Sequence, residues 1–168
     1  MATDINLKEP ILNEAVAQRK LRRMAFQIAE NNIEEKKLII AGINGNGVLL
    51  ATALVAELKK ILEIPVELLT ITLNKKYPLN ATVPGENFND EVIILVDDVA
   101  NTGKTLMYAL KPFLEFQPKK IQTLVLVERS HKLFPVHADY VGLSVSTTLQ
   151  AHITVETDGV KILGAWLH

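Results

Sequence analysis

The chain has 168 residues, of which 48% are apolar and 22% charged, a balance that excludes an intrinsically disordered chain and fits one folded domain. A formal net charge of -1 argues against binding to nucleic acid or membrane through bulk positive charge. The absence of cysteine excludes disulfides, thiolate metal sites and thiol nucleophiles. The longest nearly apolar stretch, residues 48–56, is about half of a membrane span. We expect one soluble, cytoplasmic domain over residues 1–168.

The first half of the chain predicts helices alternating with strands. Pro10 is suited to the first turn of a helix and precedes apolar residues at helical spacing, a pattern that ends at Asn31 and Asn32. Apolar and β-branched runs indicate strands, the first of which is followed by a glycine-rich loop. The elements predicted after this helix are a strand at 38–43, a helix at 48–62 and a strand at 66–73.

The middle of the chain contains the strongest strand pattern. Residues 92–96 are apolar on both faces, as in the centre of a parallel sheet. The polar residues 74–90 before them are typical of a lid or a disordered segment. The elements expected after this strand are a loop at 97–102, a helix at 103–116 and a two-sided strand at 121–127.

This alternation predicts a parallel α/β sheet with right-handed crossovers. Ligands of such sheets bind beyond the carboxyl ends of the strands. The loops at 42–47, 74–90 and 97–105 should therefore lie on one rim. Short β segments at 138–145, 153–156 and 160–166 predict a small β appendage.

One motif in these loops combines acidic residues with a potential phosphate cradle. The loop 101–105 offers free backbone amides, two threonine hydroxyls and Gly103, which allows close approach of a phosphate. Asp97 and Asp98 precede it and suit vicinal hydroxyls or a metal-bound sugar. A solvated turn is the competing interpretation. A P-loop would need glycine at Asp98, and a dinucleotide fingerprint beginning at Gly45 would need glycine at Leu50.

The stretch from Val92 to Thr105 resembles the phosphoribosyl pyrophosphate (PRPP) signature of type I phosphoribosyltransferases. Downstream, residues 127–132, Pro135 and residues 138–142 resemble the pyrimidine operon attenuator/uracil phosphoribosyltransferase group. The resemblance extends over nearly the whole chain. It implies a Rossmann-like parallel sheet flanked by helices, a lid at about 74–90 and a small β hood at about 133–158.

The resemblance also implies a role for each segment of the site. Asp97 and Asp98 would be the catalytic pair that binds the ribose hydroxyls of PRPP. The 5-phosphate would bind Ala100, Asn101, Thr102, Gly103, Lys104 and Thr105. Pyrophosphate would bind Asn44, Gly45, Asn46 and Gly47, with Lys75 and Lys76 supplied by the lid. Arg129 and Ile153 would contact substrate or product.

The implied reaction transfers the phosphoribosyl group of PRPP to uracil and releases UMP and pyrophosphate. Mg²⁺ would bind PRPP itself, with Asp97 or Asp98 as a further ligand. A homodimer is expected. The alternative is a nucleotide-sensing, RNA-binding regulator of pyrimidine genes with weak or no catalysis. The basic run Arg19, Lys20, Arg22 and Arg23 is either an RNA contact or a solvated helix face.

The sequence departs from the group at three positions that matter for chemistry. Gly45-Asn46-Gly47 stands where the group has Thr-Arg-Gly, so a cation on the leaving group is missing and turnover should be weaker. Asn101 stands where uracil-type members have Tyr and 6-oxopurine enzymes have a catalytic Asp, which disfavours a purine substrate. Ser130 replaces a glycine. The lid is also shorter.

Overall fold

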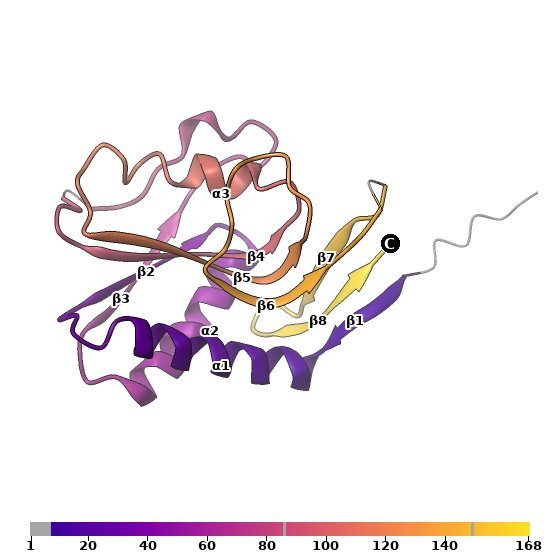
Figure 1. Cartoon of the computed structure of the whole chain (residues 1–168), viewed down its shortest axis with the longest axis horizontal. Coiled ribbons are helices and arrows are strands. Elements are labelled where there is room, and N and C mark those ends of the chain that lie inside the picture. The colour runs from indigo at the N-terminus through magenta and orange to yellow at the C-terminus, as the bar shows by residue number, and fades with distance from the viewer. Residues whose placement is uncertain (1–7, 86, 149) are drawn as a thin grey trace, which may run out of the picture.

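The computed structural model describes residues 8–85, 87–148 and 150–168. A five-stranded parallel sheet of order β3-β2-β4-β5-β6 forms the body of the protein, and a three-stranded antiparallel sheet lies beside it (Figure 1). The parallel strands are β2 (Leu38–Ile43), β3 (Val66–Ile71), β4 (Val92–Ala100), β5 (Lys120–Arg129) and β6 (Tyr140–Val145). This architecture confirms the predicted Rossmann-like sheet flanked by helices with a small β hood.

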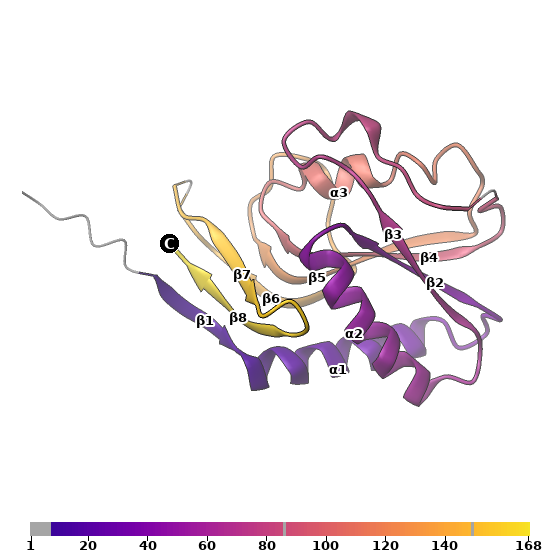
Figure 2. The same ribbon diagram turned by 180° about the vertical axis from the view of Figure 1, so that it is seen from behind.

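Helices cover both faces of the parallel sheet. The long helices α1 (Glu14–Asn31) and α2 (Asn46–Ile61) pack together on one face (Figure 2). The short helix α3 (Lys104–Ala109) and the 3-10 turn η1 (Pro78–Asn80) lie over the other. Within the described residues, no helix is both long and apolar enough to cross a membrane.

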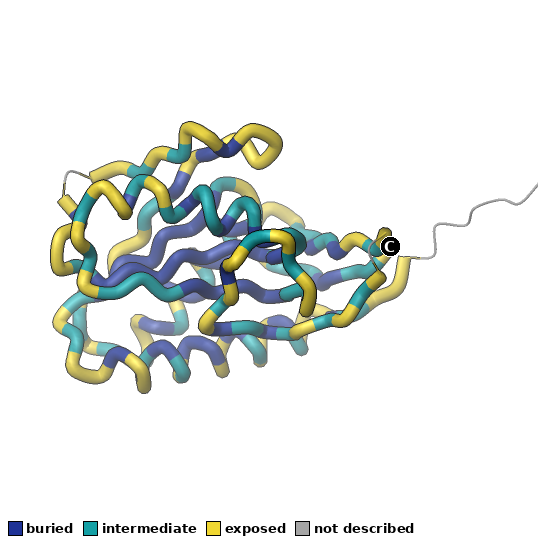
Figure 3. The backbone as a smooth tube through the Cα atoms, turned by 45° about the horizontal axis from the view of Figure 1, so that its top comes forward, coloured by how far each residue is buried: buried dark blue, intermediate teal, exposed yellow. Residues whose placement is uncertain are grey.

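Strand β4 is central because both of its faces are buried. Ile94 and Val96 pack in the core beneath α1 and α2, whereas Ile93 and Leu95 pack in the core beneath α3. Figure 3 shows the resulting layer of buried strands between more exposed helices and loops. Burial on both faces of the sheet thus explains why residues 92–96 of β4 are all apolar.

The hood differs from the predicted segment 133–158. It consists of β1 (Glu9–Asn13), β8 (Ile162–Leu167) and β7 (Ile153–Thr157), with β8 in the middle. Strand β6, expected in the appendage, instead pairs with β5 at the edge of the parallel sheet. The hood therefore joins the two ends of the described chain, a pairing that short-range patterns cannot reveal.

Pro10 was expected in a first helical turn, but it lies in the edge strand β1. Proline is tolerated there because an edge strand leaves some N–H groups unpaired, and the register shifts between Pro10 and Leu12. The helix begins later, where the Asn13 side chain accepts a hydrogen bond of 2.9 Å from the backbone N–H of Val16.

Two other boundaries also differ from the sequence prediction. Strand β4 continues through the acidic pair to Ala100 because residues 97–100 keep pairing with β5. Helix α3 ends at Ala109 rather than Phe116, and the chain continues in turns. Phe113 in these turns is fully buried and packs edge-on against Phe88, with ring centroids 5.0 Å apart, so burial adds to the turn hydrogen bonds that hold the segment.

Gly142 allows β6 to approach β5. A Cβ atom at position 142 would lie 2.3 Å from the backbone oxygen of Leu126, a distance that no ordinary contact allows. From the other side, the Arg23 guanidinium donates to the oxygens of Val141 and Gly142 at 3.0 Å each. The edge strand is thus fixed between β5 and α1.

We predict that Gly142→Ala lowers the free energy of unfolding by about 2–3 kcal/mol, because the overlap with Leu126 is with backbone. Urea denaturation measures the change. Gly159→Ala is the control: its φ of 89° is strained for alanine, but nothing lies within 4 Å of the added Cβ. A Gly142 variant no less stable than the Gly159 variant would contradict the close approach.

Candidate active site

A cavity of about 600 Å³ lies where β2, β3 and β4 end and the hood begins. The loop after β2 contributes Asn46, and the segment after β3 contributes Lys75 and Lys76. Residues 97–106 form the floor, and residues 152–155 of the hood close one side. The predicted meeting of three loops on one rim is confirmed, because parallel strands bring their carboxyl ends to the same edge.

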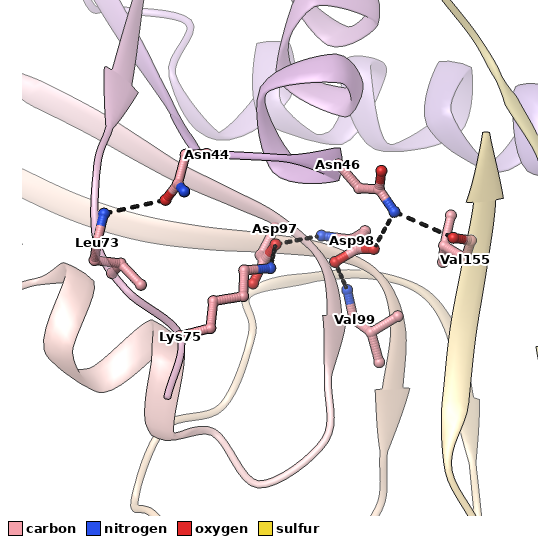
Figure 4. Close-up of polar contacts among 8 residues, drawn as sticks. All are labelled: Asn44, Asn46, Leu73, Lys75, Asp97, Asp98, Val99 and Val155. Atoms are coloured by element: carbon pink, nitrogen blue, oxygen red, sulfur yellow. Dashed lines mark hydrogen bonds and ion pairs between the residues drawn. The ribbon is translucent and has the colours of Figure 1, made fainter. Parts of the chain in front are cut away.

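The acidic pair lies at the end of β4 and is almost fully buried. Asp97 is 1% exposed and Asp98 8% exposed. Asp97 Oδ1 accepts from the backbone N–H of Asp98 at 2.9 Å, and Asp98 Oδ1 accepts from that of Val99 at 2.8 Å. These bonds hold both carboxylates against the backbone at the floor of the cavity (Figure 4).

Two side chains from other loops also reach the acidic pair. Lys75 Nζ lies 3.4 Å from Asp97 Oδ1, and the Asn46 amide donates to Asp98 Oδ2 at 3.0 Å (Figure 4). Each acid therefore has one polar partner from the rim. The sequence predicted that these segments would be neighbours but did not predict these pairings.

The pKa of Asp97 is raised from its ordinary value of 3.8 to about 7. Burial is the main cause and the negative charge of Asp98 adds to it, whereas the Lys75 ammonium opposes the shift. Asp97 therefore exchanges a proton near neutral pH. Its charge depends on what occupies the cavity.

The loop between β2 and α2 is built close to the acids. A Cβ on Gly47 would lie 2.9 Å from the Val96 oxygen and 3.1 Å from Asp97 Oδ1, so only glycine fits without displacement. Asn44 is turned toward β3, where its side-chain oxygen accepts from the Leu73 N–H at 3.1 Å. The side chain of Asn44 thus fixes the loop.

The predicted phosphate loop is supported from behind. Gly103 has φ of 84°, the left-handed region that favours glycine, and the Lys104 N–H donates to Thr102 Oγ1 at 3.2 Å. The N–H groups of Leu133 and Phe134 donate to the Thr102 oxygen at 2.9 and 3.0 Å. The segment after β5 therefore fixes the shape of this loop.

The cavity brings together many, but not all, of the predicted site residues. Those that line it are Asn46, Lys75, Lys76, Asp97, Asp98, Ala100, Asn101, Thr102, Gly103, Lys104, Thr105 and Ile153. Predicted residues that are not among the lining residues of the described chain are Asn44, Gly45, Gly47 and Arg129. The Arg129 guanidinium instead donates to the Thr148 oxygen at 2.8 Å. Thr154 and Val155 line the cavity but were not predicted, because only the hood's pairing places them there.

The basic residues on α1 differ in their surroundings. Arg23 binds carbonyl groups of β6 and so contributes to the fold. Arg19 and Arg22 are exposed and, three residues apart, lie on one side of the helix.

Comparison with known proteins agrees with this geometry. Residues 9–158 match the model of the phosphoribosyl transferase domain. The chain belongs to this family. The type I fold predicted from residues 92–105 and the resemblance to the pyrimidine operon attenuator/uracil phosphoribosyltransferase group are confirmed.

Curated relatives cover nearly the whole chain. The bifunctional protein PyrR of Ligilactobacillus salivarius is 34% identical over 92% of this chain and 94% of the relative. The bifunctional protein PyrR of Deinococcus radiodurans is 35% identical over 93% of both.

Solved structures share the fold at low sequence identity. A mutant of the Trypanosoma cruzi hypoxanthine phosphoribosyltransferase, solved as a ternary complex with substrates, superposes with a TM-score of 0.76, at 16% identity over 94% of both chains. A hypoxanthine-guanine phosphoribosyltransferase from Bacillus anthracis gives 0.72, at 18% identity over 94% of this chain and 96% of the other.

We predict that Asp97→Asn stabilises the protein at pH 8 by up to about 4 kcal/mol, because folding then no longer buries a carboxylate charge. Below about pH 4 the carboxyl is protonated in both folded and unfolded states, so the gain should disappear. Between those values the wild type should lose stability as pH rises, because only the unfolded state ionises freely.

Urea denaturation from pH 4 to 8 measures this difference. Glu63→Gln is the matched control, since Glu63 is exposed and lies outside the cavity lining. An Asp97→Asn protein that is less stable than the wild type at pH 8 would show that ionised Asp97 stabilises the fold.

Proposed function

We propose that this chain is a uracil phosphoribosyltransferase, which transfers the 5-phosphoribosyl group of PRPP to uracil and forms UMP and pyrophosphate. The observation that carries the proposal is the cavity that places Asp97 and Asp98 beside the loop 101–105 and beneath the hood. A sugar phosphate needs an anion-binding loop next to acceptors for its hydroxyls, and this cavity supplies both.

The sugar phosphate occupies the floor of the cavity in this proposal. The loop 101–105 provides backbone N–H groups and the hydroxyls of Thr102 and Thr105 for the 5-phosphate, and Gly103 leaves room for close approach. Asp97 and Asp98 accept hydrogen bonds from the ribose hydroxyls, since each carboxylate oxygen has a second lone pair.

Pyrophosphate lies toward the loop after β2 and the segment 74–90, our proposed lid. Lys75 and Lys76 bring two cations to this side of the cavity, and the backbone N–H groups of residues 44–47 complete the site. When the ribose hydroxyls take over Asp97, the Lys75 ammonium is released to the leaving pyrophosphate. This exchange partly replaces the arginine that the loop lacks.

The nucleobase lies against the hood. Ile153 is 2% exposed and offers an apolar wall, while the backbone of residues 152–155 offers hydrogen-bonding groups. Asn101 carries no titratable group and cannot act as an acid or base toward a purine ring. The relatives named PyrR also favour a pyrimidine.

The site fits Mg²⁺ bound chiefly by its substrate. Mg²⁺ prefers oxygen ligands and keeps several waters in active sites. No cluster of three metal-ligating side chains occurs among the described residues, but Asp97 and Asp98 bring carboxylates to the cavity. Asp97 or Asp98 would hold the ion together with the substrate, and the ion would supply positive charge beside the pyrophosphate.

In the reaction, the bond from ribose C1 to the pyrophosphate oxygen breaks as a uracil nitrogen bonds to C1, and the proton of that nitrogen passes to the released pyrophosphate. The residues of this chain contribute positioning, exclusion of water and stabilisation of the charge that develops on the leaving group. The direct test is incubation with PRPP, Mg²⁺ and uracil, with hypoxanthine and guanine in parallel. Pyrophosphate release with uracil supports the proposal. If none of the three bases leads to pyrophosphate release, the proposal is refuted.

We predict that Asp98→Asn weakens PRPP binding by roughly 1–3 kcal/mol, because hydroxyl hydrogen bonds to a charged acceptor become weaker. Isothermal titration calorimetry measures the change. Glu63→Gln removes the same charge from an exposed position and controls for net charge. Unchanged affinity in the Asp98 variant would remove this residue from the ribose site.

We predict that Gly103→Val reduces PRPP binding more than Asp98→Asn does. A side chain at φ of 84° is strained, so valine should change the backbone conformation of the loop that binds the phosphate. Calorimetry with ribose 5-phosphate checks the same loss without the pyrophosphate. Binding equal to that of the wild type would show that the phosphate lies elsewhere.

A second candidate is a nucleotide-sensing regulator that binds RNA and has weak or no catalysis. The exposed Arg19 and Arg22 on α1 and the printed name "bifunctional" of the relatives favour it. A gel shift with pyrimidine leader RNA, with and without UMP, separates the two functions. Tight RNA binding without pyrophosphate release would favour the regulator.

A further inference from the structure

The Asn46 side chain links two parts of the molecule that belong to different sheets. Its Nδ2 atom lies 3.0 Å from Asp98 Oδ2, at the end of β4, and 3.1 Å from the backbone oxygen of Val155, in β7 (Figure 4). A primary amide has two N–H groups, so one can serve each acceptor. Within the described residues, no other side-chain hydrogen bond joins the acidic pair to the hood.

These two bonds leave the Asn46 amide without a free donor. Its remaining polar atom is an oxygen, which points away from Asp98 in Figure 4 and would repel the oxygens of pyrophosphate. The side chain is therefore unsuited to holding the leaving group, although the backbone N–H of the same residue stays available. Its contacts suit a structural link inside the cavity.

The link acts at the point where the two ends of the ligand would meet. Asp98 belongs to the end proposed for the ribose, and residues 152–155 belong to the end proposed for the base. With Oδ1 bound by the Val99 N–H and Oδ2 by Asn46, the Asp98 carboxylate has a fixed orientation. The same amide holds β7 at a fixed distance from that carboxylate. Strand β7 is paired with β8 in the hood.

We propose that Asn46 is a positioning residue that ties Asp98 to strand β7 and thereby couples sugar binding to base binding. The proposal rests on the proposed function for the identity of the two ligand ends. A ligand that reaches both ends binds more tightly when the hood is already held in place. The affinity of a ligand limited to the sugar end does not depend on the hood. An amide carries no charge, so the link persists whatever the charge of Asp97.

The test compares ribose 5-phosphate, which reaches only the sugar end, with UMP, which reaches both. Isothermal titration calorimetry gives the dissociation constant of ribose 5-phosphate divided by that of UMP. This ratio measures how much affinity the base end adds. For Asn46→Ala we expect the ratio to fall at least about fivefold, the lower end of typical couplings between sites. We also expect faster hydrogen exchange of the β7 and β8 amides in the ligand-free variant.

A matched pair of variants separates the loss of the link from a change of charge. Asn46→Asp keeps the size of the side chain but replaces its N–H donors with acceptors. Asn44→Asp places the same charge two residues earlier in the loop and keeps an oxygen for the Leu73 N–H. Both variants should bind anionic ligands more weakly, but only Asn46→Asp should lower the ratio and speed exchange in the hood.

The outcomes bear on different claims. An unchanged ratio and unchanged hood exchange in the Asn46 variants would overturn the link. If Asn46→Ala does not fold, Asn46→Asp provides the same comparison. A wild type that binds neither ribose 5-phosphate nor UMP would refute the proposed function, while hood exchange in the free protein would still confirm or overturn the link itself.

Discussion

The burial of two adjacent carboxylates at the end of β4 is the constraint on which the cavity depends. Burying a carboxylate is unfavourable unless hydrogen bonds or opposite charges compensate it. Here the compensation comes from backbone N–H groups, from Lys75 after β3 and from Asn46 after β2. The acids therefore draw the surrounding loops inward and shape the rim of the cavity. A ligand with vicinal hydroxyls can take the place of Lys75 on Asp97.

The parallel sheet supplies the floor of the arrangement and the hood supplies one of its walls. Strand β4 is fixed by neighbours on both sides and by packed cores on both faces. The hood is a small separate sheet made from the two ends of the described chain. This division suits a cavity whose sugar phosphate end is preformed and whose base end is set by contacts such as the one made by Asn46.

Much of the fold could be predicted because its signals are local. The two-sided apolar run of β4 and the acidic and glycine-containing motif after it lie within one short stretch, residues 92–105. The strands that form the hood could not be predicted, since β1 pairs with β8 across almost the whole length of the chain. Strand β6 has the mixed burial of an edge strand. Its sequence therefore lacks the two-sided apolar pattern of the central strands and predicted part of the appendage instead. The direction of the Arg129 side chain and the partners of Asn46 depend on packing that no spacing encodes.

A crystal structure of the protein with ribose 5-phosphate bound tests the central claim most directly. The account predicts the phosphate group within the loop of residues 101–105 and both ribose hydroxyls within hydrogen-bond distance of Asp97 and Asp98, with Lys75 moved away from Asp97. A sugar phosphate bound elsewhere, with Lys75 still on Asp97 and the loop empty, would contradict it.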